Sequence, residues 1–534
     1  MTNIQGSSAP QDELETRTFS DSYRQVAEWL RCKVLDEQDV DSMLTIAELY
    51  GRMRWFNPDG VYHDDVVEDG VESKLLQSKA LHLPIFLSGT ATVLIASSLF
   101  DYGGHSRVVL NWMRAFREQG DHKLLVTRSI ASKFKNTLES EGLPFHVCRS
   151  HATSLVNEIL LYCANAERIV LHIHPDDIVA AIASKLIAKS GKPVFFYNHA
   201  DHAFSFGVSS ASLVCEISTY GIELNRRTGR VQKSCYLGIP ISSQPPEGLL
   251  ASATEAKTTR TVLTCGLPYK YAPGDAFFGD FIDNLLEKRN DVVIGLVGST
   301  GNEPWWSQVR ERWGTRLCFF GEIPYSEYVG IMKQADVYVD SFPITGGTAF
   351  PEALLSGRLV AGLNNPVQGY SPVDELRVDN IASLADEVIN LLDNAPKTIQ
   401  RVQQVRESTK AVHLVHNFRE RVKSLYAGRL DENVAGNVPV DTFWLERRWA
   451  NVSQISIPDT GIWFNLPLPF CIAFLLALDR LPSGSKEQHK RYLLTRIALK
   501  LLPAKLRAKA VAARELYLKI AAQRRNKPVV ERDR

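Results

Sequence analysis

The densest group of titratable side chains in the chain reads Asn198-His199-Ala200-Asp201-His202 and follows a short apolar run at residues 194–197. A histidine titrates near neutral pH, so a histidine that a carboxylate orients can act as a general base or acid. Asp201 is close in sequence to both histidines and can orient either one. The pattern predicts acid–base chemistry here. A hydrogen-bonded structural plug between two domains is the alternative interpretation.

A glycine loop between two strands is the second distinctive pattern, at residues 336–363. Residues 337–339 form an apolar, β-rich run, which predicts a buried strand. Gly346 and Gly347 then permit backbone conformations that a Cβ would forbid, and Thr348 can cap the helix that follows. Loop amides together with a helix N-terminus predict a site for an anion, most often phosphate.

Glu352 lies in that short helix, where a bound diphosphate would repel its carboxylate. A carboxylate beside a nucleotide site can instead accept hydrogen bonds from the hydroxyls of a ribose. The pattern therefore indicates a nucleotide rather than a free phosphate. A helix-initiating glutamate stabilised by the helix dipole, beside an ordinary tight turn, is the alternative.

Two further loops follow predicted strands. Gly103 and Gly104 open a helix after the strand at residues 92–96, with His105 at the tip of the loop. Gly266 and Lys270 follow the strand at residues 261–265, where a lysine could stabilise negative charge on a leaving diphosphate. A structural histidine and a surface lysine are the respective alternatives.

His172 and His174 share one face of a predicted strand and precede Asp176 and Asp177. Two histidines and two carboxylates could ligate a transition metal. A polar cluster that positions the neighbouring loop is the interpretation we favour, so no metal is expected.

Strands alternate with helices in two successive stretches of the chain, which predicts two parallel, doubly wound sheets. Ligands of such sheets bind at the carboxyl ends of the strands, and the polar loops described above all fall at such ends. The remaining predicted strands are residues 122–127, 145–147, 169–173, 292–297, 316–320 and 359–363.

The glycine loop with Glu352, and the G-x-x-Y-K run that ends in Lys270, resemble the donor site of GT-B glycosyltransferases. Many retaining members carry a first glutamate at the position of Ile344, so this chain is more similar to the O-GlcNAc-transferase type. The resemblance implies an α/β GT-B fold, transfer of a sugar from a nucleotide-diphosphate sugar to an unknown acceptor, and no metal or other cofactor. It implies donor contacts from Gly103, Gly104, Gly266, Lys270, Glu322, Ile323, Thr345, Gly346, Gly347, Thr348 and Glu352. The implied catalytic candidates are His105, His199, Asp201, His202 and Lys270.

The resemblance leaves alternatives open. A nucleotide-sugar epimerase or a phosphorylase would keep the fold and change the chemistry. The glutamate missing at Ile344 also admits a non-catalytic scaffold that binds glycans. The sugar, the acceptor and the stereochemical outcome are not determined by the sequence.

Net charge, cysteine spacing and the polar N-terminus limit the classes of binding partner and the cellular compartment that we expect. The 534 residues carry a net charge of +1, which gives no global attraction to nucleic acid. Eight cysteines without C-x-x-C spacing argue against a structural zinc site or a disulfide framework. The polar N-terminus resembles no secretory signal, so we expect a cytoplasmic protein.

Four regions are predicted: a helical extension (1–85), an acceptor-side Rossmann-like domain (86–245), a donor domain (261–395), and a crossover helix with a basic helical tail (396–534). Residues 462–478 are apolar but short and broken by prolines, which favours a buried or interfacial element over a membrane span. Residues 486–534 carry 15 Lys and Arg against 4 Asp and Glu. This tail is either a solvated helix or an attachment to an anionic membrane surface.

Overall fold

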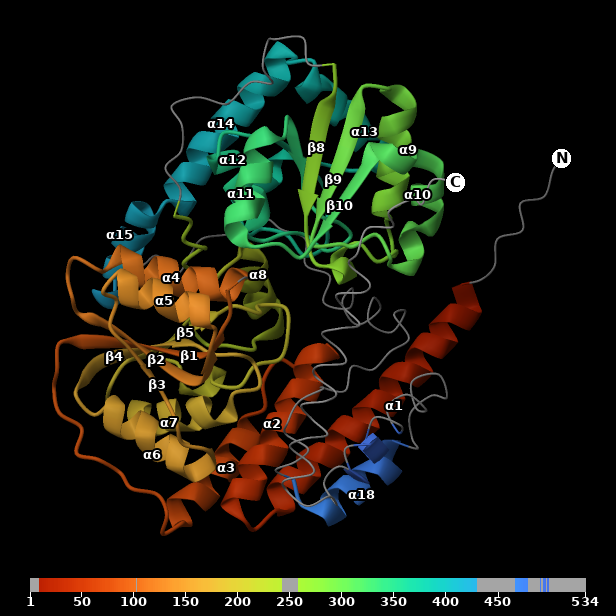
Figure 1. Ribbon diagram of the computed structural model, residues 1–534. Helices are drawn as coiled ribbons and strands as arrows, with labels where there is room; N and C mark the ends of the chain where they lie inside the picture. The colour runs from red at the N-terminus through yellow and green to blue at the C-terminus, as the bar shows by residue number, and fades with distance from the viewer. Residues whose placement is uncertain are drawn as a thin grey trace, which may run out of the picture.

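The computed structural model describes residues 9–101, 103–242, 258–429 and 466–478, together with positions 490, 493–495 and 497–498. Two parallel sheets, one above the other in Figure 1, organise these residues into two domains. Apart from positions 490, 493–495 and 497–498, the predicted basic tail lies outside the described residues, as does most of the stretch between the two domains.

The first domain is built on a seven-stranded parallel sheet in the order β3-β2-β1-β4-β5-β6-β7. Its strands are almost continuously apolar because helices cover both faces of the sheet. The strands are β1 (Ala91–Leu99), β2 (His122–Ile130), β3 (Phe145–Val147), β4 (Ala166–His172), β5 (Val194–Asn198), β6 (Leu213–Glu216) and β7 (Ser234–Tyr236). The helices are α4 (Gly104–Ala115), α5 (Ser132–Ser140), α6 (Ala152–Tyr162), α7 (Ile178–Lys189) and α8 (Thr219–Thr228).

The second domain has a six-stranded parallel sheet in the order β10-β9-β8-β11-β12-β13. The strands are β8 (Arg260–Cys265), β9 (Val292–Val297), β10 (Leu317–Gly321), β11 (Val337–Val339), β12 (Leu359–Leu363) and β13 (Arg377–Val378). The helices are α9 (Phe278–Lys288), α10 (Ser307–Trp313), α11 (Tyr325–Gln334), α12 (Ala349–Leu355), α13 (Ile381–Leu392) and α14 (Pro396–His413). Together the two sheets confirm the predicted GT-B fold.

The chain crosses back to the first domain through α14 and α15 (Val415–Tyr426), which run down one side of the molecule in Figure 1. The sequence predicted a single crossover helix, and the structure has two, which meet at Leu414. There Leu414 forms a β-bridge with Ile241, and the His413 imidazole lies 2.7 Å from the carbonyl oxygen of Ile239. Phe418 of α15 then packs in the first domain, its ring 5.0 Å from that of Trp112. These contacts tie the returning chain to the first domain.

A helical layer precedes the first sheet and packs on α6 and α7. It consists of α1 (Ala9–Asp36), α2 (Val40–Phe56) and α3 (Asp65–Gln77). The first of these helices already begins at Ala9, and extending an existing helix costs far less than nucleating one. Gly51 allows α2 its close approach, because a Cβ at this position would lie 2.4 Å from the Phe206 ring.

The described part of the apolar C-terminal run forms α18 (Leu468–Ala477), which lies beside α1 (Figure 1). Phe470 and Phe474 contact the Trp29 ring at 5.6 and 5.8 Å between centroids. Within the described ranges, no helix has both the length and the apolar character to cross a membrane.

Candidate functional site

The glycine loop of the second domain closes around Asp340, at the end of β11. The amide of Gly346 donates to the Asp340 carboxylate at 3.1 Å, and Arg377 donates to the same carboxylate at 2.7 Å. A Cβ on Gly346 would lie 2.7 Å from this carboxylate, so the position requires glycine. The amide of Gly346, expected to face an anion, is therefore used inside the loop.

Two other groups of this loop remain available to a ligand. The amides of Gly347 and Thr348 have no hydrogen-bond partner in the part of the chain that the structure describes. Lys270 reaches the loop from the end of β8 and donates from Nζ to the carbonyl oxygen of Thr345 at 2.7 Å. The lysine and the two amides thus belong to one loop assembly.

Gly266 packs beneath this lysine, since a Cβ there would lie 3.1 Å from the Lys270 side chain. Glu322 and Ile323 follow β10; Glu322 is exposed, whereas Ile323 packs partly against the core of the second domain. They lie just ahead of Tyr325, whose hydroxyl donates to the Glu352 carboxylate.

The glycine loops of the two domains meet. Thr348 occupies the position before α12 but makes no capping hydrogen bond, contrary to expectation. Its hydroxyl faces the first domain instead, and a Cβ on Gly104 would lie 3.2 Å from Thr348 Oγ1. Gly103 has a φ of +95°, a conformation that favours glycine at the turn from β1 into α4. The carboxyl ends of the two sheets therefore face each other here.

Glu352 is held across this interface. One carboxylate oxygen accepts hydrogen bonds from Arg107 of α4 and from the hydroxyl of Tyr325. The Arg107 guanidinium also lies over the Tyr325 ring, 4.4 Å from its centroid. Glu352 is only 3% exposed, and its second oxygen, Oε2, has no hydrogen-bond partner among the described residues. A buried carboxylate oxygen without a partner is costly, so Oε2 is a candidate ligand contact.

Four histidines gather at the carboxyl end of the first sheet. His105 Nε2 lies 2.6 Å from the carbonyl oxygen of His172, and His172 Nδ1 lies 2.9 Å from His199 Nε2. The rings of His105 and His199 are 4.3 Å apart, and those of His105 and His174 are 4.9 Å apart. Because a carbonyl oxygen only accepts, His105 carries its proton on Nε2 and presents a lone pair at Nδ1. His105 Nδ1 is buried and has no partner in the described part of the chain.

Burial keeps this cluster neutral. Burial, with a smaller effect from His174, lowers the pKa of His105 to about 3. Burial also lowers the pKa values of His172, His174 and His199 below their ordinary range. The histidines are thus unprotonated bases at neutral pH. Asp176 and Asp177 do not join them: Asp176 pairs with Arg52 and Arg128, and Asp177 accepts from Ser97 and Thr127.

Asp201 orients His202 rather than His199. It is fully buried, and its Oδ1 lies 3.1 Å from His202 Nδ1 and 3.3 Å from the hydroxyl of Tyr370, a residue of the second domain. Ser218 donates to the other oxygen. The sequence cluster is therefore divided: His199 belongs to the histidine group, whereas Asp201 and His202 belong to a contact between domains. Tyr370 also packs on Gly347, where a Cβ would lie 3.4 Å from its ring.

Two aromatic side chains, Trp55 and Phe100, pack against His174 and form with it a surface that we call the aromatic wall. The Trp55 ring at the end of α2 lies 5.7 Å from that of His174, and the Phe100 ring stacks on His174 at 6.4 Å. Phe100 is 45% exposed. No sequence pattern connects residue 55 with this region, because α2 precedes the first sheet.

Arg107, Tyr325, Tyr370 and Trp55 were not among the predicted site residues. Arg107 lies three residues after Gly104, in the helix that the predicted glycine loop opens, so a signal for it was present. The other three lie in segments without a local motif, and only their partners reveal them.

No protein-family model matches the chain, and no curated protein matches it. Several solved structures are similar. Anabaena HepE in complex with UDP and glucose is 16% identical, with a TM-score of 0.48, over 62% of this chain and 99% of that one. A glycosyltransferase from Rickettsia africae is 12% identical, with a TM-score of 0.49, over 64% and 98%. A variant of the Thermobaculum terrenum O-GlcNAc transferase is 12% identical, with a TM-score of 0.45, over 77% and 79%.

Such low similarity assigns neither a substrate nor an activity to this chain. The sheet orders and the facing strand ends of the chain itself identify it as a two-domain protein of the GT-B fold.

Proposed function

We propose that the protein is a glycosyltransferase that moves a sugar from a nucleotide-diphosphate sugar to an acceptor. The observation that carries this proposal is the meeting of the two glycine loops. Lys270 and Glu352 Oε2, which has no partner among the described residues, lie on the donor side, and neutral histidines lie on the other. A diphosphate needs a cation and free amides, a ribose needs an acceptor of hydrogen bonds, and an acceptor hydroxyl needs a base.

On the donor side, the amides of Gly347 and Thr348 and the ammonium of Lys270 would bind the diphosphate. Charge that develops on the leaving nucleotide would be stabilised by this fixed cation. Glu352 Oε2 would accept from a ribose hydroxyl, while Arg107 and Tyr325 hold the other oxygen in place. Glu322 and Ile323 would lie toward the nucleobase.

On the acceptor side, His105 is the best-placed group to accept a hydrogen bond from the acceptor hydroxyl, because its Nδ1 offers a buried lone pair beside the loop of Gly104. Its pKa of about 3 makes it a weak base, so it would orient this hydroxyl rather than deprotonate it in advance. His199 packs against His105 and helps to exclude water around it. The aromatic wall of Trp55, Phe100 and His174 would contact the acceptor, since sugar rings pack their C–H faces on aromatic side chains. Asp201 and His202 would instead hold Tyr370 and thereby the spacing of the domains.

The test is a thermal-stability screen with UDP-, GDP-, ADP- and dTDP-linked sugars, followed by donor hydrolysis and transfer assays. One nucleotide sugar should raise the melting temperature, because a ligand that binds only the folded state stabilises it by mass action. Glu352→Ala should abolish that rise. Glu327→Ala, on the exposed surface of α11, is the control and should retain it. If no nucleotide sugar stabilises the wild type, the proposal is wrong.

A second candidate function follows from the interdomain pair of Arg107 and Glu352. If this pair only fastens the two domains together, the protein is a non-catalytic GT-B-like binding protein. Glu352→Ala would then have a lower melting temperature than the wild type in the absence of ligand. Nucleotide sugars would stabilise neither the wild type nor Glu352→Ala. An epimerase or phosphorylase would instead bind the donor and change it without an acceptor, which the hydrolysis and transfer assays distinguish.

We also propose a peripheral membrane location from the basic residues at 486–534, most of which lie outside the described ranges. Flotation with phosphatidylserine-containing vesicles, and with phosphatidylcholine vesicles as the control, tests it. Binding to both or to neither would contradict an electrostatic attachment.

A further inference from the structure

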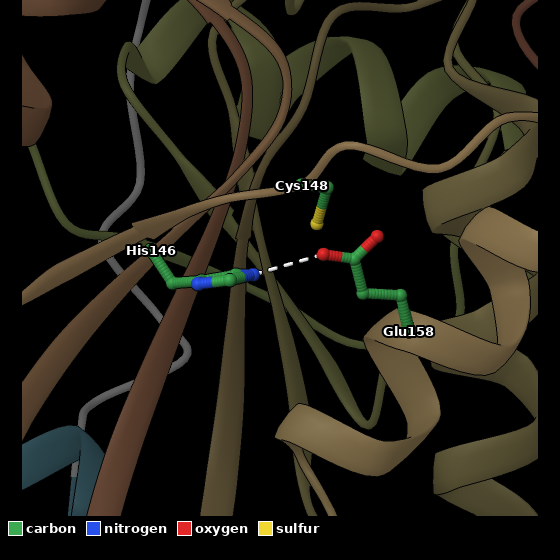
Figure 2. A group of neighbouring side chains, drawn as sticks. All are labelled: His146, Cys148 and Glu158. Carbon is green, nitrogen blue, oxygen red and sulfur yellow. Dashed lines mark hydrogen bonds and ion pairs between the residues drawn. The ribbon is translucent and has the colours of Figure 1, made fainter.

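Three potential metal ligands come together between β3 and α6 (Figure 2). His146 lies in β3 and Cys148 just beyond its end, so their side chains leave the strand on the same side. Glu158 reaches them from α6. Their ligand atoms all lie within 4.8 Å of one another, and His146 Nε2 is 2.9 Å from Glu158 Oε1. No other group of three such side chains occurs within the described residues.

Neighbouring groups hold two of these ligands in place. The amides of Arg149 and Ser150 donate to Glu158 Oε2 at 3.2 and 3.1 Å, which leaves Oε1 directed at the imidazole. The Tyr162 ring stacks on His146, with 5.3 Å between centroids and 21° between planes. Such outer contacts typically orient the ligands of a metal site.

Charge and access suit a divalent ion. A thiolate and a carboxylate together neutralise a 2+ ion, so the complex adds no net charge to a partly buried place. The His146 side chain is 43% exposed, whereas Cys148 is 7% exposed, so an ion can enter from the imidazole side. Nitrogen, sulfur and carboxylate oxygen together are the ligands that Zn²⁺ prefers.

We propose that His146, Cys148 and Glu158 bind one Zn²⁺ ion, with solvent as the fourth ligand. Zinc bonds of about 2.0–2.3 Å require the imidazole nitrogen and the carboxylate oxygen to separate by only a few tenths of an ångström. The Cys148 thiol gives its proton to solvent as the zinc–sulfur bond forms, and no redox change is involved.

The ion would fasten β3 to α6. The same helix is bound to the N-terminal layer through Thr153, whose hydroxyl donates to Asp41 of α2 at 2.6 Å. Zinc would therefore stabilise the edge of the first domain to which the N-terminal layer is attached. This inference does not depend on the proposed transferase activity.

The experiment uses the full-length protein, freed of metal with a chelator and titrated with Co²⁺ and then Zn²⁺. The wild type should bind one Co²⁺ with a thiolate-to-cobalt charge-transfer absorption band, which Zn²⁺ should displace. Cys148→Ser should lose that band and bind Zn²⁺ at least tenfold more weakly. Cys318→Ser, at an exposed cysteine, should behave like the wild type.

His146→Asn provides a second variant, because its half-exposed position makes misfolding a lesser concern than at Cys148. It should keep the fold by circular dichroism and lose tight binding. A wild type without the charge-transfer band, a Cys148→Ser variant that keeps it, or a Cys318→Ser variant that loses it would each overturn the proposal.

Discussion

Replacing Lys270 with Met removes a single positive charge from the glycine loop and keeps an unbranched side chain of similar length. Lys270 Nζ lies 2.7 Å from the carbonyl oxygen of Thr345, directly before the loop amides proposed to bind a diphosphate. The lysine is half-buried, so water screens its charge only in part. The substitution should therefore weaken phosphate binding specifically.

A hydrogen bond to a charged group contributes about 1.5–3 kcal/mol. Since about 1.4 kcal/mol corresponds to a tenfold change, Lys270→Met should raise the Kd of a nucleoside diphosphate by about 10- to 150-fold. The matching nucleoside lacks phosphates and should bind equally well to the variant and to the wild type.

Isothermal titration calorimetry with UDP, GDP, ADP and dTDP, and with their nucleosides, measures both quantities. Lys288→Met is the matched control, since Lys288 lies on α9 of the same domain and pairs at 2.6 Å with Asp386. Its nucleotide affinities should equal those of the wild type. If Lys270→Met lost affinity equally for the nucleoside and for the diphosphate, the substitution would have deformed the loop. If it lost affinity for neither, Lys270 would not face the phosphates.

Three further predictions concern other parts of the molecule. Gly104→Val should lower transfer activity at least tenfold without lowering the melting temperature, because the valine side chain would enter the space beside Thr348. Unchanged activity would show that the two glycine loops do not face each other at the site of transfer. The melting temperature should fall as the pH drops from 6.5 toward 4. Burial lowers the pKa of a neutral histidine in the folded protein, to about 3 for His105, so the unfolded chain takes up a proton at a higher pH than the folded one. Acidification therefore favours the unfolded chain. His105→Asn should reduce that fall and the exposed His416→Asn should not; identical pH profiles would contradict this. Gly51→Ala should destabilise the protein by about 1–3 kcal/mol through the clash with Phe206, whereas Gly330→Ala, in open space on α11, should be neutral or stabilising; equal unfolding curves would contradict the close packing of α2.

The strands and the polar loops at their ends were predictable because they depend on local sequence. Runs such as residues 292–297 are apolar over the length of a strand, and glycine and proline mark where each run ends. The same reasoning located the loop of Gly346 and Gly347, and the alternation of strands and helices predicted the parallel sheets.

The roles of individual site residues were less accessible. The amide of Gly346 was expected to face a phosphate, but it donates its hydrogen bond to the Asp340 carboxylate. Asp201 lies within two residues of both His199 and His202, and in the structure its carboxylate contacts His202. A shift of one residue in the position of a loop bend changes which neighbour a side chain contacts. The local sequence does not determine the position of that bend.

The sequence alone determined the elements of this protein, since hydrophobic spacing and turn residues act within a few positions. Only the tertiary structure decided which of those elements meet. Glu352 finds Arg107 from the other domain, Trp55 of the N-terminal layer reaches His174, and His146, Cys148 and Glu158 converge between a strand and a helix. Each of these contacts depends on the order of strands in a sheet or on the packing of one domain against another, which many distant residues set together.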